Sequence, residues 1–281
     1  MIIIADSGSS KIDWRLITSD GEITQSQCAG FNPYYQPKAD LRKNISEIIV
    51  PLANETVKKI FFYGTGVSSE GNVKIIQDTF NEFFTQAKVT VEWDLLAAAR
   101  ATCGDEEGLV CILGTGSNTC KYDGKDIVEQ VANLGWILAD EGSGTSIGKK
   151  FLFDYLRKLM PEKLANMFHE QYPFTREEFL EKIYTQENPN KFLASFSKFI
   201  HKNLNDPYCH NLIYNCFSEF IENNIMLYRG YKKLKVHSIG SIGFHFSNIL
   251  RQVADAKGIM LKNNLEAPIA ALSLYHKKDL E

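Results

Sequence analysis

An acidic residue followed by small residues ends the first apolar segment of the chain. Residues 2–5 are apolar and lead into Asp6-Ser7-Gly8-Ser9-Ser10-Lys11. In a turn of this kind, small side chains leave the backbone N–H groups open to an anion. Ser10 and Lys11 could add a hydroxyl donor and a positive charge, and Asp6 could hold Mg²⁺ directly or through water. The alternative is an ordinary β-hairpin turn.

A second turn of the same kind follows the apolar run at 109–113, with the sequence Gly114-Thr115-Gly116-Ser117-Asn118. Two such turns at matching positions could hold a polyphosphate between them. Neither turn matches G-x-x-x-x-G-K-[ST], which disfavours a P-loop nucleotidase. Neither opens a helix as G-x-G-x-x-G must, which disfavours a dinucleotide-binding Rossmann site.

Asp94 stands where an expected strand, 89–92, gives way to the helical segment that begins at Leu95. A carboxylate there could accept the proton from an attacking hydroxyl, as the catalytic aspartate of kinases does. The alternative role is a helix N-cap, which aspartate fills well. One residue can serve both roles.

Two further motifs have the residue types of ligand sites. Asp140 and Glu141 come before Gly142-Ser143, and paired carboxylates accept strong hydrogen bonds from sugar hydroxyls. Alternatively, Ser143 caps the next helix and the two acids favour its dipole. Gly240-Ser241-Ile242-Gly243 lies between a strand and a helix, where a nucleotide base or ribose could rest against bare backbone; it could equally be a tight turn.

The elements that must position these residues occur in the same order twice. Each half is expected to run strand, Gly/Ser turn, strand, strand, helix, strand, helix, strand. We expect strands at 2–5, 12–18, 22–28, 59–63, 89–92, 109–113, 119–122, 127–131, 236–239 and 258–261. The duplication predicts two α/β lobes, residues 1–105 and 106–281, with a helical insertion at about 144–230 in the second and a ligand cleft between them.

Composition excludes several classes of protein. The 281 residues are 44% hydrophobic and 23% charged, as in ordinary globular proteins rather than disordered ones. Lys+Arg 31 against Asp+Glu 34 leaves a formal charge of −3, so neither nucleic acid nor an anionic membrane is expected as a partner. No apolar run approaches the roughly 20 residues of a membrane helix, and residues 1–6 are too short for a signal sequence. Six scattered cysteines without a C-x-x-C pair predict reduced, mostly buried thiols in a cytoplasmic protein.

Taken together, the motifs resemble the N-acetylglucosamine kinase family, which is grouped with the BadF/BadG/BcrA/BcrD ATPases in the superfamily of actin, sugar kinases and Hsp70. The resemblance is densest over 94–144, where D-x-x-A-A, G-x-x-x-x-L-G-T-G-S-N and D-E-G-S follow one another at the family's spacing. It implies an α/β fold of duplicated actin-like ATPase (ribonuclease H-like) domains, with two lobes around a nucleotide cleft. ATP and Mg²⁺ are the implied cofactors.

The resemblance also implies roles for single residues. Asp94 matches the catalytic base, and Asp6 matches the Mg²⁺-associated acid. The implied ATP-binding residues are Ser7, Gly8, Ser9, Ser10, Lys11, Gly114, Thr115, Gly116, Ser117, Gly240 and Gly243. The implied sugar-binding residues are Asn32, Asn133, Gly135, Asp140 and Glu141.

The activity implied is transfer of the γ-phosphate of ATP to an amino sugar, with N-acetylglucosamine and its C6 hydroxyl first. The segment 132–135 stands where the family often has Gly-Gly-Trp-Gly, and Trp136 comes two positions after the family's tryptophan. A kinase for glucosamine or N-acetylmuramic acid, a BadF-type ATPase that activates a partner enzyme, and a sugar sensor without turnover are the alternatives. A small sugar is the implied partner, and a homodimer would be in keeping with many relatives.

Overall fold

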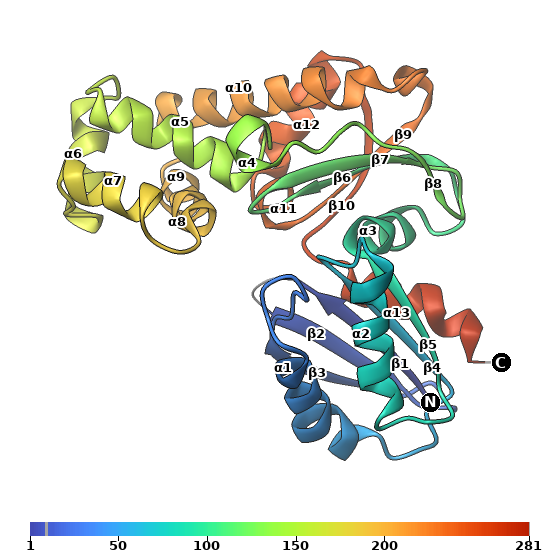
Figure 1. Ribbon diagram of the computed structural model, residues 1–281. Helices are drawn as coiled ribbons and strands as arrows, with labels where there is room; N and C mark the ends of the chain where they lie inside the picture. Colours follow the sequence, from blue (N-terminus) through green and yellow to red (C-terminus); the bar gives the residue numbers. More distant parts are fainter. Residues whose placement is uncertain (9–10, 281) are drawn as a thin grey trace. The chain divides into compact units, whose positions relative to one another are not determined.

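A computed structural model of the protein describes residues 1–8 and 11–280. The chain forms two compact units (Figure 1). Unit 1 contains Met1–Asp105, Gly124–Asp126 and Ala267–Glu281, and unit 2 contains Glu106–Asp123 and Ile127–Glu266. Among the described residues, no helix combines the length and apolar character needed to cross a membrane.

Unit 1 is built on a five-stranded sheet in the order β3-β2-β1-β4-β5. The central strand β1 pairs antiparallel with β2 and parallel with β4. The strands are β1 Ile2–Ser7, β2 Lys11–Ile17, β3 Ile23–Ala29, β4 Lys59–Gly64 and β5 Lys88–Trp93. The helices are α1 Lys38–Asn44, a π-helical turn Ile45–Ile49, a 3₁₀ turn Val50–Leu52, α2 Glu70–Asn81, α3 Asp94–Cys103, α13 Ile269–Tyr275 and a 3₁₀ turn His276–Asp279.

Unit 2 repeats this sheet. Its first strand, β6, pairs antiparallel with β7 and parallel with β9, and the order β8-β7-β6-β9-β10 corresponds strand by strand to that of unit 1. The strands are β6 Gly108–Leu113, β7 Ser117–Tyr122, β8 Ile127–Glu129, β9 Lys235–Ile239 and β10 Met260–Leu265. The predicted α/β fold with an internal duplication is therefore confirmed.

The predicted helical insertion of unit 2 is also present. Between β8 and β9 the chain forms α4 Gly135–Leu138, α5 Gly144–Leu156, α6 Glu162–Gln171, α7 Arg176–Tyr184, α8 Pro189–Ser195, α9 Ser197–Lys202, α10 Pro207–Asn223 and the 3₁₀ turns Ile225–Leu227 and Tyr231–Lys233. After β9 come α11 Ser241–His245 and α12 Ser247–Ala256.

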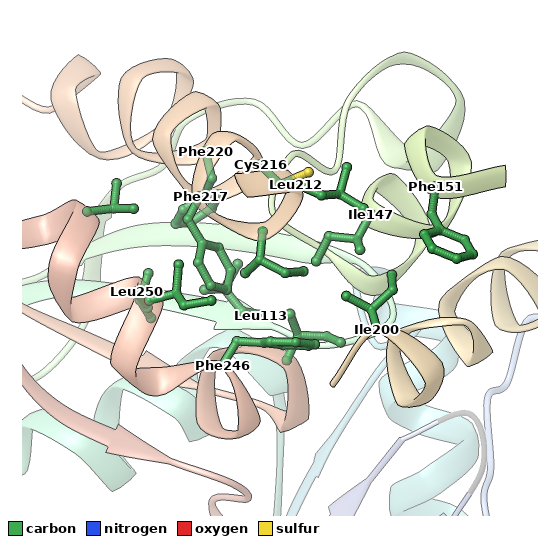
Figure 2. Packing of buried hydrophobic residues seen from close by; sticks show 14 of the residues in the cluster. Leu113, Ile147, Phe151, Ile200, Leu212, Cys216, Phe217, Phe220, Phe246 and Leu250 are labelled. Carbon is green, nitrogen blue, oxygen red and sulfur yellow. The ribbon is translucent and has the colours of Figure 1, made fainter. Parts of the chain in front are cut away.

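Helical periodicity explains how the insertion packs on the sheet. On α10, Leu212, Cys216 and Phe220 recur every fourth residue and are all buried. Figure 2 shows these side chains facing Ile147 of α5 and Leu113 of β6 within one apolar cluster. The insertion and the sheet of unit 2 therefore share a single core.

The last helix, α13, packs in unit 1 rather than beside the strands that precede it in sequence. Its Ile269 and Leu272 are buried in one cluster with Ile2, Ile4 and Tyr63. Five of the six cysteines are buried and Cys28 is partly exposed, as the sequence predicts.

Candidate active site

Carboxylates gather at the end of β1 in unit 1. Asp6 lies directly opposite Asp13 in the antiparallel register of β1 and β2. The Lys11 ammonium lies 2.8 Å from one oxygen of Asp13, and Gln27 Nε2 donates to the other at 2.7 Å. The hairpin thus places two acids side by side, with a single lysine against one of them.

The Asp6 carboxyl is poorly accommodated as an anion. Its pKa is raised to about 7, mainly by burial and also by the charges of Asp13 and Asp94, while the charge of Lys11 acts in the opposite direction. A divalent cation would offset both the burial and the repulsion, and Mg²⁺ typically takes only one or two protein carboxylates together with phosphate oxygens and water. No group of three or more His, Cys, Asp or Glu side chains in residues 1–8 and 11–280 is arranged to hold a metal alone. The Asp6–Asp13 pair could supply one or two carboxylate oxygens to a cation that also binds phosphate and water.

Asp94 is the first residue of α3, directly after β5. The N-cap position of α3 is held by Trp93, whose side chain makes no capping hydrogen bond. Asp94 is the first helical residue and so lies one position after the N-cap that was its alternative role. Burial raises the pKa of Asp94 to about 6, and hydrogen bonds from the backbone N–H groups of Leu95 and of Asp94 itself pull it down. A carboxyl with this pKa is mostly ionised at neutral pH yet strong enough as a base to accept a proton.

The first Gly/Ser turn is only partly described. Ser7 is buried and its Oγ donates to the carbonyl of Phe31 at 3.0 Å, while the Gly8 N–H donates to the Lys11 carbonyl at 2.9 Å. The Ser7 hydroxyl therefore holds the β3–α1 connection to β1. Predicted ATP-binding residues Ser9 and Ser10 lie outside the described residues.

Asn32 is buried beside this turn, next to Phe31 in the same connection. Its Oδ1 accepts from the Tyr34 N–H at 3.0 Å, and its own N–H donates to Gln36 Oε1 at 2.8 Å. At Gly66, which has φ +77°, a Cβ would lie 2.3 Å from Asn32 Oδ1. The sequence reasoning did not single out Gly66, which packs against Asn32; its local signal is the glycine-rich end of β4.

In the turn after β6 of unit 2, the backbone carbonyls accept hydrogen bonds, whereas two backbone N–H groups donate none to the described residues. The Thr145 N–H and hydroxyl both donate to the Thr115 carbonyl, at 3.1 and 2.7 Å, and the Gly144 N–H donates to the Gly114 carbonyl at 2.9 Å. The N–H groups of Thr115 and Gly116 make no hydrogen bond within the described part of the chain. Such N–H groups suit an anion. Thr145, at the start of α5, is a second residue that the sequence reasoning missed.

Asp140 lies against this turn. A Cβ on Gly116 would stand 2.8 Å from Asp140 Oδ2, so a side chain there would displace the Asp140 carboxylate. Asp140 itself has φ 64°, a conformation that non-glycine residues rarely adopt and that commonly occurs at functional sites. Burial raises its pKa, while a hydrogen bond from the Ser117 N–H and the charge of Lys149 lower it.

The other predicted sugar residues of unit 2 make structural contacts. The carboxylate of Glu141 accepts from the side-chain amides of Asn223 at 3.2 Å and Asn224 at 3.5 Å. Asn133 Nδ2 donates to the Ser117 carbonyl at 3.0 Å, and its Oδ1 accepts from the Gly135 N–H at 2.9 Å. The Asn133 bond ties the segment before α5 to Ser117 at the start of β7, and the Glu141 bonds tie it to the end of α10.

The last predicted motif connects β9 to α11 through two tightly packed glycines. Gly240 has φ +117°, and a Cβ there would stand 2.5 Å from the Leu113 carbonyl oxygen. A Cβ on Gly243 would stand 2.5 Å from Ser238 Oγ. Both glycines are therefore required for packing near the end of β6, whatever ligand the turn meets.

Comparison with known proteins agrees with this geometry. The profile of the BadF/BadG/BcrA/BcrD ATPase family matches residues 5–159, more than half of the chain. This range contains Asp6, Asp94 and Asp140 and ends before the Gly240 turn. No curated protein matches the chain.

Three solved structures are similar over nearly the whole chain. A candidate N-acetylglucosamine kinase from Porphyromonas gingivalis is 35% identical, with a TM-score of 0.92 and 99% of each chain covered. A candidate N-acetylglucosamine kinase from Chromobacterium violaceum is 16% identical, with a TM-score of 0.73, covering 100% of this chain and 98% of that one. A ROK family glucokinase from Streptomyces griseus, in complex with glucose and AMPPNP, is 15% identical, with a TM-score of 0.56, covering 99% and 98%. The last two show a shared fold.

Proposed function

Because the chain belongs to the BadF/BadG/BcrA/BcrD ATPase family, we propose that it is an ATP-dependent sugar kinase that phosphorylates N-acetylglucosamine at its C6 hydroxyl. The observation that carries the proposal is the state of Asp94, a buried carboxyl whose pKa is raised to about 6 at the start of α3. Perturbed carboxyls of this kind are concentrated at catalytic sites.

In the proposed reaction, Asp94 accepts the proton of the sugar hydroxyl as its oxygen attacks the γ-phosphorus of ATP. The new bond is O–P, and the bond between the γ-phosphorus and the bridging oxygen of ADP breaks. Positioning and charge neutralisation supply most of the rate in such transfers. At neutral pH most Asp94 side chains would be ready to accept the proton.

ATP would be held by the turn that carries Gly114, Thr115, Gly116 and Ser117. The proposal is supported by the open N–H groups of Thr115 and Gly116, which can donate to phosphate oxygens. Mg²⁺ bound with the phosphates would neutralise their charge, and Asp6 with Asp13 is the carboxylate pair suited to contact it or its water ligands. Gly240 and Gly243 are proposed to border the adenosine.

The sugar is assigned to Asn32 and Asp140. Asp140 is supported by its position against the turn and by its exceptional backbone conformation, and Asn32 by its burial beside Gly66. N-acetylglucosamine is proposed as the acceptor because a candidate kinase for this sugar shares 35% of its residues with the whole chain.

The experiment is ADP release in MgATP with N-acetylglucosamine, glucosamine, N-acetylmuramic acid, glucose or no sugar. We expect release that depends on N-acetylglucosamine, with the product phosphorylated at C6 by NMR. Asp94→Asn should abolish it, whereas Asp78→Asn, an exposed aspartate on α2 of the same unit, should leave it unchanged.

Each other outcome would change the proposal. A different best sugar would retain the kinase and replace its acceptor. ADP release that ignores every sugar would replace the kinase with an ATPase that energises a partner. Normal turnover in Asp94→Asn would remove Asp94 as the base.

A further inference from the structure

A cavity of about 650 Å³ opens among the helices of the unit 2 insertion. It is formed by α4, α5, α7, α8 and the connection between α7 and α8. The lining residues are Trp136, Ile137, Lys149, Leu152, Phe153, Leu156, Ile183, Tyr184, Gln186, Pro189 and Leu193. Nine of these eleven side chains are aliphatic or aromatic. The volume lies in the range of small-molecule sites.

The wall of this cavity exposes large apolar side chains to solvent. Ile137 is 73% exposed, Tyr184 80% and Phe153 54%. Isolated exposed apolar residues are ordinary, but several around one concave site indicate a binding surface. Four helices contribute to the concavity, so an occupant of limited size can be enclosed on several sides.

A single cation is set into the apolar wall. Lys149 Nζ donates to the Trp136 carbonyl at 2.6 Å and lies 6.0 Å from the centre of the Trp136 ring. Among the residues that the structure describes, Lys149 forms no ion pair, although its charge acts on the Asp140 carboxyl, whereas its neighbour Lys150 pairs with Glu219. Lys149 therefore has two ammonium protons left for a ligand, since an ammonium group carries three donors.

We propose that this cavity binds a small amphiphilic carboxylate, with its apolar body against Ile137 and Phe153 and its carboxylate at Lys149. A carboxylate would form a charge-assisted hydrogen bond with the ammonium, which is stronger than the bond a neutral group could form. The apolar body would remove exposed hydrophobic surface from water, which favours binding.

The test is isothermal titration of the whole chain with octanoate, with its neutral counterpart octanamide, and with acetate. We expect octanoate to bind about tenfold or more tightly than octanamide, because a hydrogen bond to a charged group contributes about 1.5–3 kcal/mol. Acetate, which lacks the apolar body, should not bind measurably. Octanoate should also change the fluorescence of Trp136, which lines the cavity.

Three variants separate the two parts of the proposal. Lys149→Met should reduce the affinity for octanoate to that for octanamide. Octanamide binding should persist in this variant, which would show that the cavity is intact. Lys149→Arg should keep the preference for octanoate over octanamide. Ile137→Asn should weaken both ligands. Leu274→Asn, which changes a 66% exposed leucine of unit 1, is the matched control and should change neither.

Equal affinity for octanoate and octanamide in the unaltered chain would overturn the proposal, and so would an unchanged preference in Lys149→Met. Absence of octanoate binding would overturn it as well. These readouts contain neither ATP nor sugar, so they are independent of whether the chain is a kinase.

Discussion

Replacing Asp94 by asparagine should make the folded protein more stable at neutral pH. Burial raises the pKa of Asp94 from 3.8 to about 6, which corresponds to about 3 kcal/mol. Because the folded pKa lies above the unfolded one, ionising this group opposes folding. The penalty is absent well below pH 3.8, grows as the pH rises from 3.8 to 6, and is complete above pH 6.

The expected gain therefore depends on pH. Asparagine keeps the shape of the side chain and an oxygen that can accept from the Leu95 N–H, but it carries no charge to desolvate. We expect Asp94→Asn to raise the free energy of unfolding by up to about 3 kcal/mol at pH 8 and by only about 1.5 kcal/mol at pH 5. The same substitution is therefore expected to stabilise the folded protein and to abolish its activity.

The assay is urea unfolding of the whole chain at both pH values, followed by tryptophan fluorescence. Trp14 is fully buried in unit 1 against Phe62 and Phe80, so its emission reports on that unit. Asp78→Asn is the matched control and should change stability by less than about 0.5 kcal/mol. Equal stability of Asp94→Asn and the unaltered chain at pH 8 would refute the reasoning, as would a gain that is larger at pH 5.

Further predictions concern activity and packing. Sugar-dependent kcat/KM should fall about tenfold from pH 7 to pH 5, because the ionised fraction of a base with a pKa of about 6 falls from about nine tenths to one tenth. Gly240→Ala should lower thermal stability by about 2–4 kcal/mol, since its Cβ would stand 2.5 Å from the Leu113 carbonyl oxygen at φ +117°. Tyr63→Phe should cost about 1–3 kcal/mol in calorimetry, because the buried hydroxyl bonds to His276 Nε2 at 2.8 Å.

These predictions have their own controls. Gly71→Ala adds a Cβ that meets nothing within 4 Å, inside α2, and should raise stability by up to about 1 kcal/mol. If it destabilises as much as Gly240→Ala, glycine-specific packing at Gly240 is the wrong explanation. A flat pH–rate profile between 5 and 7 would contradict the assignment of the base. Unchanged unfolding of Tyr63→Phe would show that its hydroxyl is replaceable by water.

The sequence predicted the sheets better than the helix boundaries. Alternation and apolar runs placed all ten strands because each strand is short and bounded by glycine or polar turns. The buried Leu41, Ile45 and Ile49 recur every fourth residue, as on an α-helix, but α1 ends at Asn44 and the chain continues as a π-helical turn. A spacing of four residues between apolar side chains does not distinguish an α-helix from a π-helical turn. Gly240-Ser241-Ile242-Gly243 was expected to connect a strand to a helix, and a separate short helix, α11 at Ser241–His245, begins within this motif.

The sequence predicted which residue types could do chemistry at the site, but it did not predict the contacts that these residues make. Asp6 and Asp94 were identified from their places after strands, but the burial that raises their pKa values depends on packing around them. Glu141 was expected to meet a sugar, and its contacts with Asn223 and Asn224 bridge 82 residues of sequence. A local sequence pattern does not reveal contacts between residues that are so far apart in the sequence. Thr145 has no sequence signal of its own, because its role depends on the carbonyl of Thr115.

The placement of α13 has a consequence for synthesis on the ribosome. Unit 2 is nearly continuous in sequence, so its core can be complete once residue 266 has emerged. In unit 1, the apolar face formed by Ile2, Ile4 and Tyr63 is covered only in part, by Ala97 of α3, until Ile269 and Leu272 arrive. Unit 1 is therefore completed after unit 2, and that face of its nascent sheet stays partly exposed while more than 160 residues are translated at about 5–20 residues per second.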